Sequence, residues 1–176
     1  SNYDKVVVFG DIHGCYEPLK NYFELNPFNE KYLYIFTGDY VDRGIQNKEV
    51  LEFLIKIKDS KNVILLEGNH EAHLRKYSEK NADLDSITST EFKSNTIPQI
   101  ESIPKKDLRQ LCRKFSQMEF FYFGVNRYVV CHGGIPCEPS ILTPTVELIK
   151  GVGKYEDHDK IDKQFITNSN ITFVIG

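Results

Sequence analysis

One pattern, an apolar run followed by glycine and a polar residue, occurs three times in the first 70 residues and constrains the fold more than any other feature. The runs and their turns are 5–9 with Gly10-Asp11, 32–36 with Gly38-Asp39, and 63–66 with Gly68-Asn69. A helical pattern follows each turn. Strands that alternate with helices predict parallel βαβ units, in which right-handed crossovers place all the turns at one sheet edge. We therefore expect an α/β fold.

The turn over Gly38–Gly44 is unusually rich in charge. Asp39, Asp42 and Arg43 lie within five residues at the end of a buried strand, between glycines that let the backbone turn sharply. The carboxyl ends of the strands are where open α/β sheets bind ligands. Metal or anion binding explains two acids and an arginine at this place better than a structural loop does.

The second half of the chain has less regular patterns. Residues 81–104 are rich in Ser, Thr and Asn without a clean period, so we expect a loop-rich insert or an irregular cap near the substrate. Apolar residues at helical spacing predict an amphipathic helix over 108–118. A hairpin is expected over 120–131, and its second strand leads into His132-Gly133-Gly134. A last strand is expected over 171–175.

Composition excludes several classes of function. The chain has 176 residues, of which 40% are hydrophobic and 27% charged, which fits one globular domain over 1–176. Its net charge of −3 gives no general attraction for nucleic acid or for an anionic membrane, and no apolar stretch approaches the roughly 20 residues of a membrane span. The four cysteines are scattered, with no CxxC pair, so a cytoplasmic chain with reduced thiols is expected.

Six polar residues follow the expected strands and form the candidate site. Taken singly, Asp11 could cap a helix, His13 could be a turn histidine, and Asn69 could occupy a left-handed turn. Four turns that each deliver Asp, Asn or His to one sheet edge are much harder to explain as caps. Carboxylate, amide and imidazole donors without a thiolate favour divalent Mn, Fe or Zn. The six residues are Asp11, His13, Asp39, Asn69, His70 and His132.

The order of the four motifs resembles that of a known enzyme family. GDIHG (10–14), GDYVDRG (38–44), GNHE (68–71) and HGG (132–134) are similar to the signature of the calcineurin-like metallophosphoesterases. Within that superfamily the chain most resembles the serine/threonine phosphoprotein phosphatases and their bacterial and phage relatives. The resemblance implies a metallophosphoesterase-type αββα sandwich with metal ligands at the strand ends.

The resemblance also implies two divalent metal ions, manganese first, with Fe, Zn or Ni as options. Asp11 and His13 would hold the first ion, and Asn69 and His132 the second. Asp39 would bridge them, with one oxygen on each ion. A shared anionic ligand is physically reasonable because two cations about 3.5–4 Å apart repel one another. A hydroxide that bridges the metals would then attack phosphorus.

The remaining motif residues would act on the substrate. In the family's pattern, His70 protonates the leaving oxygen, and Asp42 orients His70 and raises its pKa. Arg43 would bind the phosphate oxygens bidentately.

The sequence departs from the family in two places. Relatives carry a further histidine for the second metal after a late strand and glycine, a context matched by Ile171–Gly176, so we expect a C-terminally truncated chain that binds the first metal more strongly. The protein phosphatases also use a second phosphate-binding arginine after HGG. No arginine follows Arg127 here, although Lys150 lies where such a residue could fall.

The leading hypothesis is metal-dependent hydrolysis of phosphate monoesters in the manner of a serine/threonine protein phosphatase. The expected partner is a phosphorylated substrate, either protein or nucleotide. One alternative is a nucleotide-directed phosphatase, which would act on dinucleoside polyphosphates or polynucleotide ends. A third is a non-catalytic binding module that keeps the fold, although it would predict lost ligands, and Asp11, His70 and His132 are all present.

Overall fold

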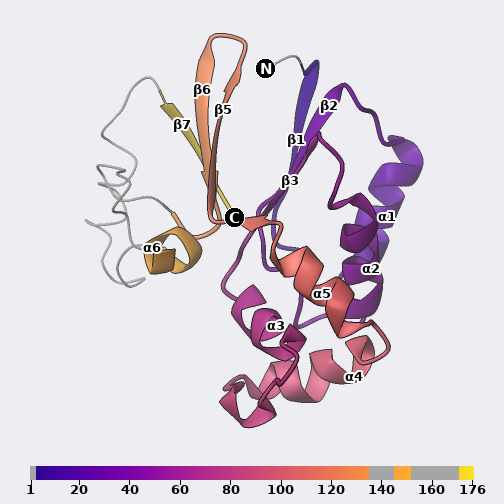
Figure 1. Cartoon of the computed structure of the whole chain (residues 1–176). Coiled ribbons are helices and arrows are strands. Elements are labelled where there is room, and N and C mark those ends of the chain that lie inside the picture. Colours follow the sequence, from indigo (N-terminus) through magenta and orange to yellow (C-terminus); the bar gives the residue numbers. More distant parts are fainter. Residues whose placement is uncertain (1–2, 135–144, 152–170) are drawn as a thin grey trace.

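The computed structural model describes residues 3–134, 145–151 and 171–176, and it contains two β-sheets (Figure 1). The first sheet has four parallel strands in the order β1-β2-β3-β4. Their bounds are β1 Lys5–Phe9, β2 Tyr32–Phe36, β3 Val63–Leu66 and β4 Phe115–Ser116. The helices after β1, β2 and β3 are α1 (Tyr16–Leu25), α2 (Asn47–Ile57) and α3 (Glu71–Ser78). The predicted parallel βαβ units are confirmed.

Alternate residues of β2 show how the layers form. Tyr34 and Phe36 belong to the large apolar cluster beneath the helices, whereas Leu33 and Ile35 belong to a second cluster that reaches Val130 on the other sheet. Because side chains alternate along a strand, this pattern buries both faces of the first sheet.

The second sheet completes the sandwich. It contains β5 (Met118–Phe123), β6 (Asn126–Cys131) and β7 (Ile171–Ile175), in the order β5-β6-β7. β5 and β6 form the predicted antiparallel hairpin, and β7 pairs parallel to β6. Helix α6 (Thr145–Lys150) packs on the outer face through Leu148 (Figure 1). Helices, two sheets and a helix therefore form the expected αββα order.

Residues 81–104 differ from the expected loop-rich insert. They contain the 3₁₀-helix η1 (Leu84–Ser86), the π-helix η2 (Phe92–Thr96) and α4 (Ile97–Ile100). Ile87, Phe92 and Ile100 are fully buried in the main apolar cluster. Residues 90–100 form one continuous helical run that passes through π geometry at 92–96, and the wider π turn breaks the 3.6-residue hydrophobic period by which a helix is recognised in the sequence.

The expected helix over 108–118 is too long. Helix α5 covers Lys105–Cys112, and Phe115 already pairs with Leu65 of β3. Met118 then begins β5 in the other sheet. Phe115 and Met118 continue the helical spacing only by coincidence, and pairing with existing strands overrides the local pattern. In the described parts of the chain, no helix has the length and apolar character needed to cross a membrane.

Candidate metal centre

The four motif turns meet at one place, but they come from two sheets. The turns after β1, β2 and β3 lie at the carboxyl edge of the first sheet, whereas His132 follows β6 of the second sheet. The expectation of one common sheet edge is therefore wrong for the fourth turn. The chain changes sheets between β4 and β5, and β6 then delivers His132 to the same site.

Backbone strain is concentrated in the candidate site. Within the described residues, the non-glycine residues with positive φ are His13 (43°), Asp39 (51°), Asp42 (72°) and Arg43 (63°). Such conformations cost about 1–3 kcal/mol each and persist only where the surroundings impose them. All four residues are ones that the motifs predict to be functional.

Two motif glycines allow the second and third turns to touch. A Cβ atom on Gly38 would lie 2.4 Å from the backbone nitrogen of Gly68, and one on Gly68 would lie 2.3 Å from Asp39 Oδ1. The backbones of the two turns therefore meet directly, which brings Asp39 beside Asn69. Any side chain at either position would push these two turns apart.

A buried carboxylate ties the same turns together. Glu71 is fully buried and accepts backbone N–H bonds from Asp39 (2.8 Å), Tyr40 (2.9 Å) and Gly68 (2.8 Å). Burial and the nearby charge of Asp39 raise the pKa of Glu71 to about 7, against the effect of these hydrogen bonds. Glu71 had no predicted role, although its position directly after His70 in the GNHE motif was a usable signal.

Two imidazoles are oriented with Nε2 toward the centre. His13 Nδ1 lies 2.9 Å from the carbonyl oxygen of Val41, and His132 Nδ1 lies 3.1 Å from that of Thr37. A carbonyl can only accept, so Nδ1 carries the proton in each ring and Nε2 presents its lone pair. His13 Nε2 is buried without a hydrogen-bond partner. This orientation is typical of metal-ligating histidines.

The Nε2 atoms of three histidines converge on a single oxygen of Asp39. Oδ2 lies 3.5 Å from His13 Nε2, 3.4 Å from His132 Nε2 and 3.9 Å from His70 Nε2. Burial acts to raise the pKa of Asp39, but the neighbouring His132, together with the backbone N–H and the charge of His70, leaves it below its usual value. Oδ1 instead accepts the backbone N–H of His70 at 3.0 Å. Oδ2 therefore faces the imidazoles and Oδ1 faces the backbone of His70, and the expectation that each oxygen binds a different ion stays a prediction.

Asp11 and Asn69 complete the cluster. Asp11 lies between two rings, with Oδ2 3.8 Å from His13 Nε2 and Oδ1 3.7 Å from His132 Nδ1. Asn69 Oδ1 lies 3.3 Å from His132 Nε2. Two groups have donor atoms close enough to hold one ion each, and Asp39 belongs to both. The groups are His13, Asp39 and His70, and Asp11, Asp39 and His132. The sequence-based pairing of Asp11 with His13 differs from this grouping.

The proposed acid and its partner are in direct contact. His70 Nδ1 lies 2.6 Å from Asp42 Oδ2, and this hydrogen bond raises the pKa of His70 despite partial burial. Asp42 is fully buried, and its other oxygen accepts the hydroxyl of Thr96. Thr96 was absent from the sequence-based site, since no spacing linked it to the second motif.

Two candidate phosphate-binding residues lie on the exposed side. Arg43 is exposed, and its backbone N–H donates to Glu91 Oε1 at 2.7 Å. No ion pair of its guanidinium is found in the described part of the chain. Lys150 ends α6, whose last turn lies against the HGG motif, because Gly133 N–H donates to the carbonyl of Leu148 at 2.7 Å.

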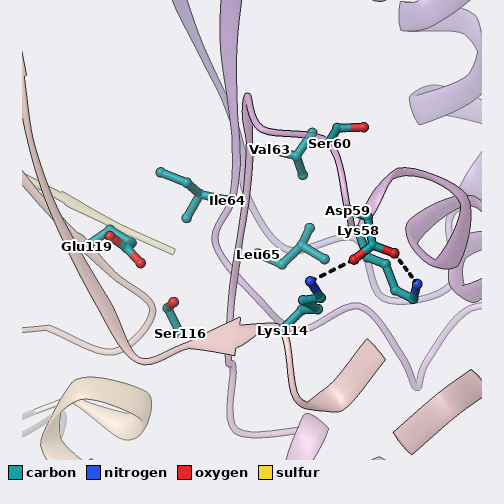
Figure 2. Close-up of a pocket in the computed structure, with 9 residues that line it drawn as sticks. All are labelled: Lys58, Asp59, Ser60, Val63, Ile64, Leu65, Lys114, Ser116 and Glu119. Carbon is teal, nitrogen blue, oxygen red and sulfur yellow. Dashed lines mark hydrogen bonds and ion pairs between the residues drawn. The ribbon is translucent and has the colours of Figure 1, made fainter. Parts of the chain in front are cut away.

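A pocket of about 260 Å³ elsewhere on the protein contains none of these residues. It is lined by residues from the start of β3 and from the chain around β4 (Figure 2). Its lysines are already paired, since Asp59 contacts Lys114 at 2.7 Å and Lys58 at 2.6 Å (Figure 2). These two bonds lower the pKa of Asp59 to about 2. The pocket therefore lacks the free, converging donors of the metal centre.

The cluster fits divalent metal ions by its own chemistry. It combines oriented imidazoles, a shared carboxylate oxygen and an orphaned buried nitrogen, without a thiolate. A model of the calcineurin-like phosphoesterase family matches residues 4–172. The chain belongs to this family. This membership accounts for the fold, the four motif turns and the cluster of candidate ligands.

Two of the proteins to which this chain is similar are named as serine/threonine phosphatases. The serine/threonine-protein phosphatase PP1-delta of Caenorhabditis elegans is 48% identical over 68 residues, which are 38% of this chain and 22% of that protein. A Saccharomyces cerevisiae protein serine/threonine phosphatase, described as similar to human PP5, superposes with a TM-score of 0.55 at 27% identity, over 77% of this chain and 39% of that one. The chain thus spans well under half the length of these two relatives.

A second solved structure shows the same fold. The crystal structure of a putative diadenosine tetraphosphatase has a TM-score of 0.57 at 23% identity, and the match covers 81% of this chain and 56% of that one. At this identity the likeness supports the architecture alone.

Proposed function

We propose that this chain provides the catalytic centre of a metal-dependent phosphomonoesterase of the serine/threonine protein phosphatase type. The observation that carries the proposal is the convergence of His13 Nε2 and His132 Nε2 on Asp39 Oδ2, at 3.5 Å and 3.4 Å. Asp11, His13, Asp39, Asn69 and His132 would hold two divalent cations, with manganese as the first choice. Bound there, the cations supply the nucleophile by lowering the pKa of a water molecule.

The chain's own residues would handle the phosphate and the leaving group. His70, held 2.6 Å from Asp42, is suited to give a proton to the departing oxygen. The exposed guanidinium of Arg43 is suited to bind two phosphate oxygens, and Lys150 would add a point charge from α6.

Two relatives favour phosphoprotein over nucleotide substrates. The similarity to PP1-delta and to the yeast phosphatase exceeds 25% identity, whereas the diadenosine tetraphosphatase shares only the fold. We therefore place phosphoserine and phosphothreonine peptides first, and nucleotides are an alternative outcome of the test.

A substrate panel tests the proposal. The protein is assayed with Mn²⁺ on p-nitrophenyl phosphate, phosphopeptides, a dinucleoside tetraphosphate and 5′-phosphorylated oligonucleotides. We expect turnover of p-nitrophenyl phosphate and phosphopeptides that EDTA abolishes. His70→Asn should lower kcat about 100-fold or more while Mn²⁺ binding persists, and Asp39→Asn should lower both. Absence of Mn²⁺-dependent turnover on the whole panel would refute the proposal.

Metal counting tests the site separately from turnover. In the ligand assignment that the family resemblance implies, Asp11 and His13 add a carboxylate to the shared Asp39, whereas Asn69 and His132 add only neutral donors. We therefore expect one Mn²⁺ to bind more strongly than the other in calorimetric titration. Two equally strong sites would contradict this ranking.

A further inference from the structure

Polar side chains of residues 91–99 hold the turn that contains Asp42. Glu91 Oε1 accepts the Arg43 N–H at 2.7 Å, and Gln99 Oε1 accepts the Asn47 N–H at 2.9 Å. The carbonyl of Gly44 accepts amide donors from Asn95 (3.1 Å) and Gln99 (3.2 Å). Residues 91–99 therefore hold the turn over 42–44 through hydrogen bonds, although their sequence suggested an irregular cap.

Thr96 makes the contact of this segment that lies nearest the chemistry. It ends the π-helix η2 and is fully buried, and its hydroxyl donates to Asp42 Oδ1. Phe92 anchors the same π-helix in the main apolar cluster. Single-turn π-helices occur often at functional sites, and this one presents a buried hydroxyl to a buried carboxylate.

Asp42 has one hydrogen-bonding partner on each oxygen in the described structure. Thr96 occupies Oδ1, and His70 Nδ1 occupies Oδ2 at 2.6 Å. A carboxylate without the first bond is free to rotate about its Cβ–Cγ bond and loses its fixed direction toward the ring. A buried oxygen left without a donor also seeks a new one.

We propose that Thr96 is a positioning residue for phosphate ester hydrolysis, which it serves by fixing Asp42 and thereby the imidazole of His70. This inference rests on the proposed function. Thr96 contacts neither metal ligands nor the phosphate, so its effect must pass through His70. The loss of its hydroxyl should weaken proton donation to the leaving oxygen and leave metal binding intact.

The dependence of the rate on the leaving group is the test. Wild type, Thr96→Val and Thr96→Ser are assayed with Mn²⁺ on phenyl phosphate, whose leaving group needs a proton, and on 2,4-dinitrophenyl phosphate, whose leaving group does not. Thr96→Val should lower kcat about 10-fold or more on phenyl phosphate, a part of the ~10²–10⁴ that a general acid contributes. On dinitrophenyl phosphate the change should stay below about 3-fold, and Thr96→Ser should retain wild-type behaviour.

Controls separate positioning from a general loss of structure. Thr90→Val makes the same substitution at an exposed position just before residues 91–99 and should leave both rates unchanged. In a His70→Asn background, Thr96→Val should cause no further loss of kcat, because residues that act through one another are not additive. Thr96→Ala serves in the same assays if the valine variant does not fold, and thermal unfolding and Mn²⁺ titration monitor each variant.

Distinct results would overturn the inference. If the variants without the hydroxyl lose rate equally on both substrates, or lose further rate in the His70→Asn background, Thr96 has only a structural role. If the wild type is active and Thr96→Val matches it on phenyl phosphate, the inference is wrong while the proposed function stands. An inactive wild type on every phosphate ester refutes the proposed function itself.

Discussion

The two sheets contribute to the same site in different ways. The first sheet is buried on both faces and supplies three of the four motif turns. The second sheet supplies His132 alone, and its edge strand β5 exposes Met118 (38%), Phe120 (47%) and Tyr122 (49%). Most of the geometry of the site is therefore imposed by the sheet with the larger core.

The polar contacts of the turns follow the same division. The first-sheet turns share a buried carboxylate, Glu71, and receive further bonds from residues 91–99. Among the described residues, the turn of the second sheet is held by the bond from Gly176 N–H to the carbonyl of His132 at 3.0 Å and by the bond from Gly133 N–H to the carbonyl of Leu148 at 2.7 Å. This comparison indicates that strained loops are stable where a rigid core surrounds them, and it leads to five predictions.

The largest effect is expected for Glu71→Ala. It leaves the buried N–H groups of Asp39, Tyr40 and Gly68 without an acceptor, at about 1–3 kcal/mol each. We expect the free energy of unfolding to fall by about 3–6 kcal/mol in urea titration. Glu101→Ala, at an exposed position, should change it by less than about 0.5 kcal/mol. If the two variants were equally stable, the carboxylate would not be holding the turns.

Matched leucine-to-alanine substitutions compare the two cores directly. Leu54 on α2 is fully buried in the large cluster, whereas Leu148 on α6 packs in the small cluster on the outer face of the second sheet. Leu54→Ala should cost about 3–5 kcal/mol, and Leu148→Ala about 1–2 kcal/mol, because Leu148 is less completely buried and lies on the outer face of its sheet. Chemical denaturation gives both values. Equal costs would remove the energetic difference between the layers.

The sequence predicted the first sheet and its turns most completely, and it also predicted the hairpin and the last strand of the second sheet. Strands β1, β2 and β3 are continuous apolar runs, and the ligands follow them directly, so Asp11, Asp39 and Asn69 could be placed from local pattern alone. Thr96 could not, because its role depends on a contact with Asp42 across 54 positions of the chain. The sequence also could not predict which oxygen of Asp39 faces the imidazoles, because that depends on the hydrogen bond from the N–H of His70 to Oδ1.

Two buried cysteines, one in each apolar cluster, can report when the structure around each of them opens. Cys112 lies on α5 in the large cluster, and Cys131 lies on β6 in the small one. In a Cys15→Ser, Cys137→Ser background, labelling with iodoacetamide should modify Cys131 before Cys112, because the smaller core opens at lower free energy. The reverse order, read by mass spectrometry, would contradict the comparison.

The pH dependence of the Cys112 signal has a definite sign. Burial raises the pKa of this thiol from 9.0 to about 12. The native state therefore holds the proton more tightly than the unfolded state, and this contribution to stability is present below pH 9 and is lost as the pH rises toward 12. Cys112 in the native protein should stay unlabelled at pH 9, where a small-molecule thiol added as a reference reacts readily.

The smallest effect is expected on the open face of β5. Phe120 is half exposed and packs edge-to-face on Tyr122 at 5.2 Å. Phe120→Thr keeps a residue that favours strands and removes a side chain that folding does not bury fully. We expect the free energy of unfolding to change by less than about 1 kcal/mol, whereas Phe36→Thr, at a fully buried position of β2, should cost about 3–5 kcal/mol. A comparable cost at both positions would mean that the second sheet is as firmly packed as the first, and the rigidity of the site would then have to come from the polar contacts of its turns.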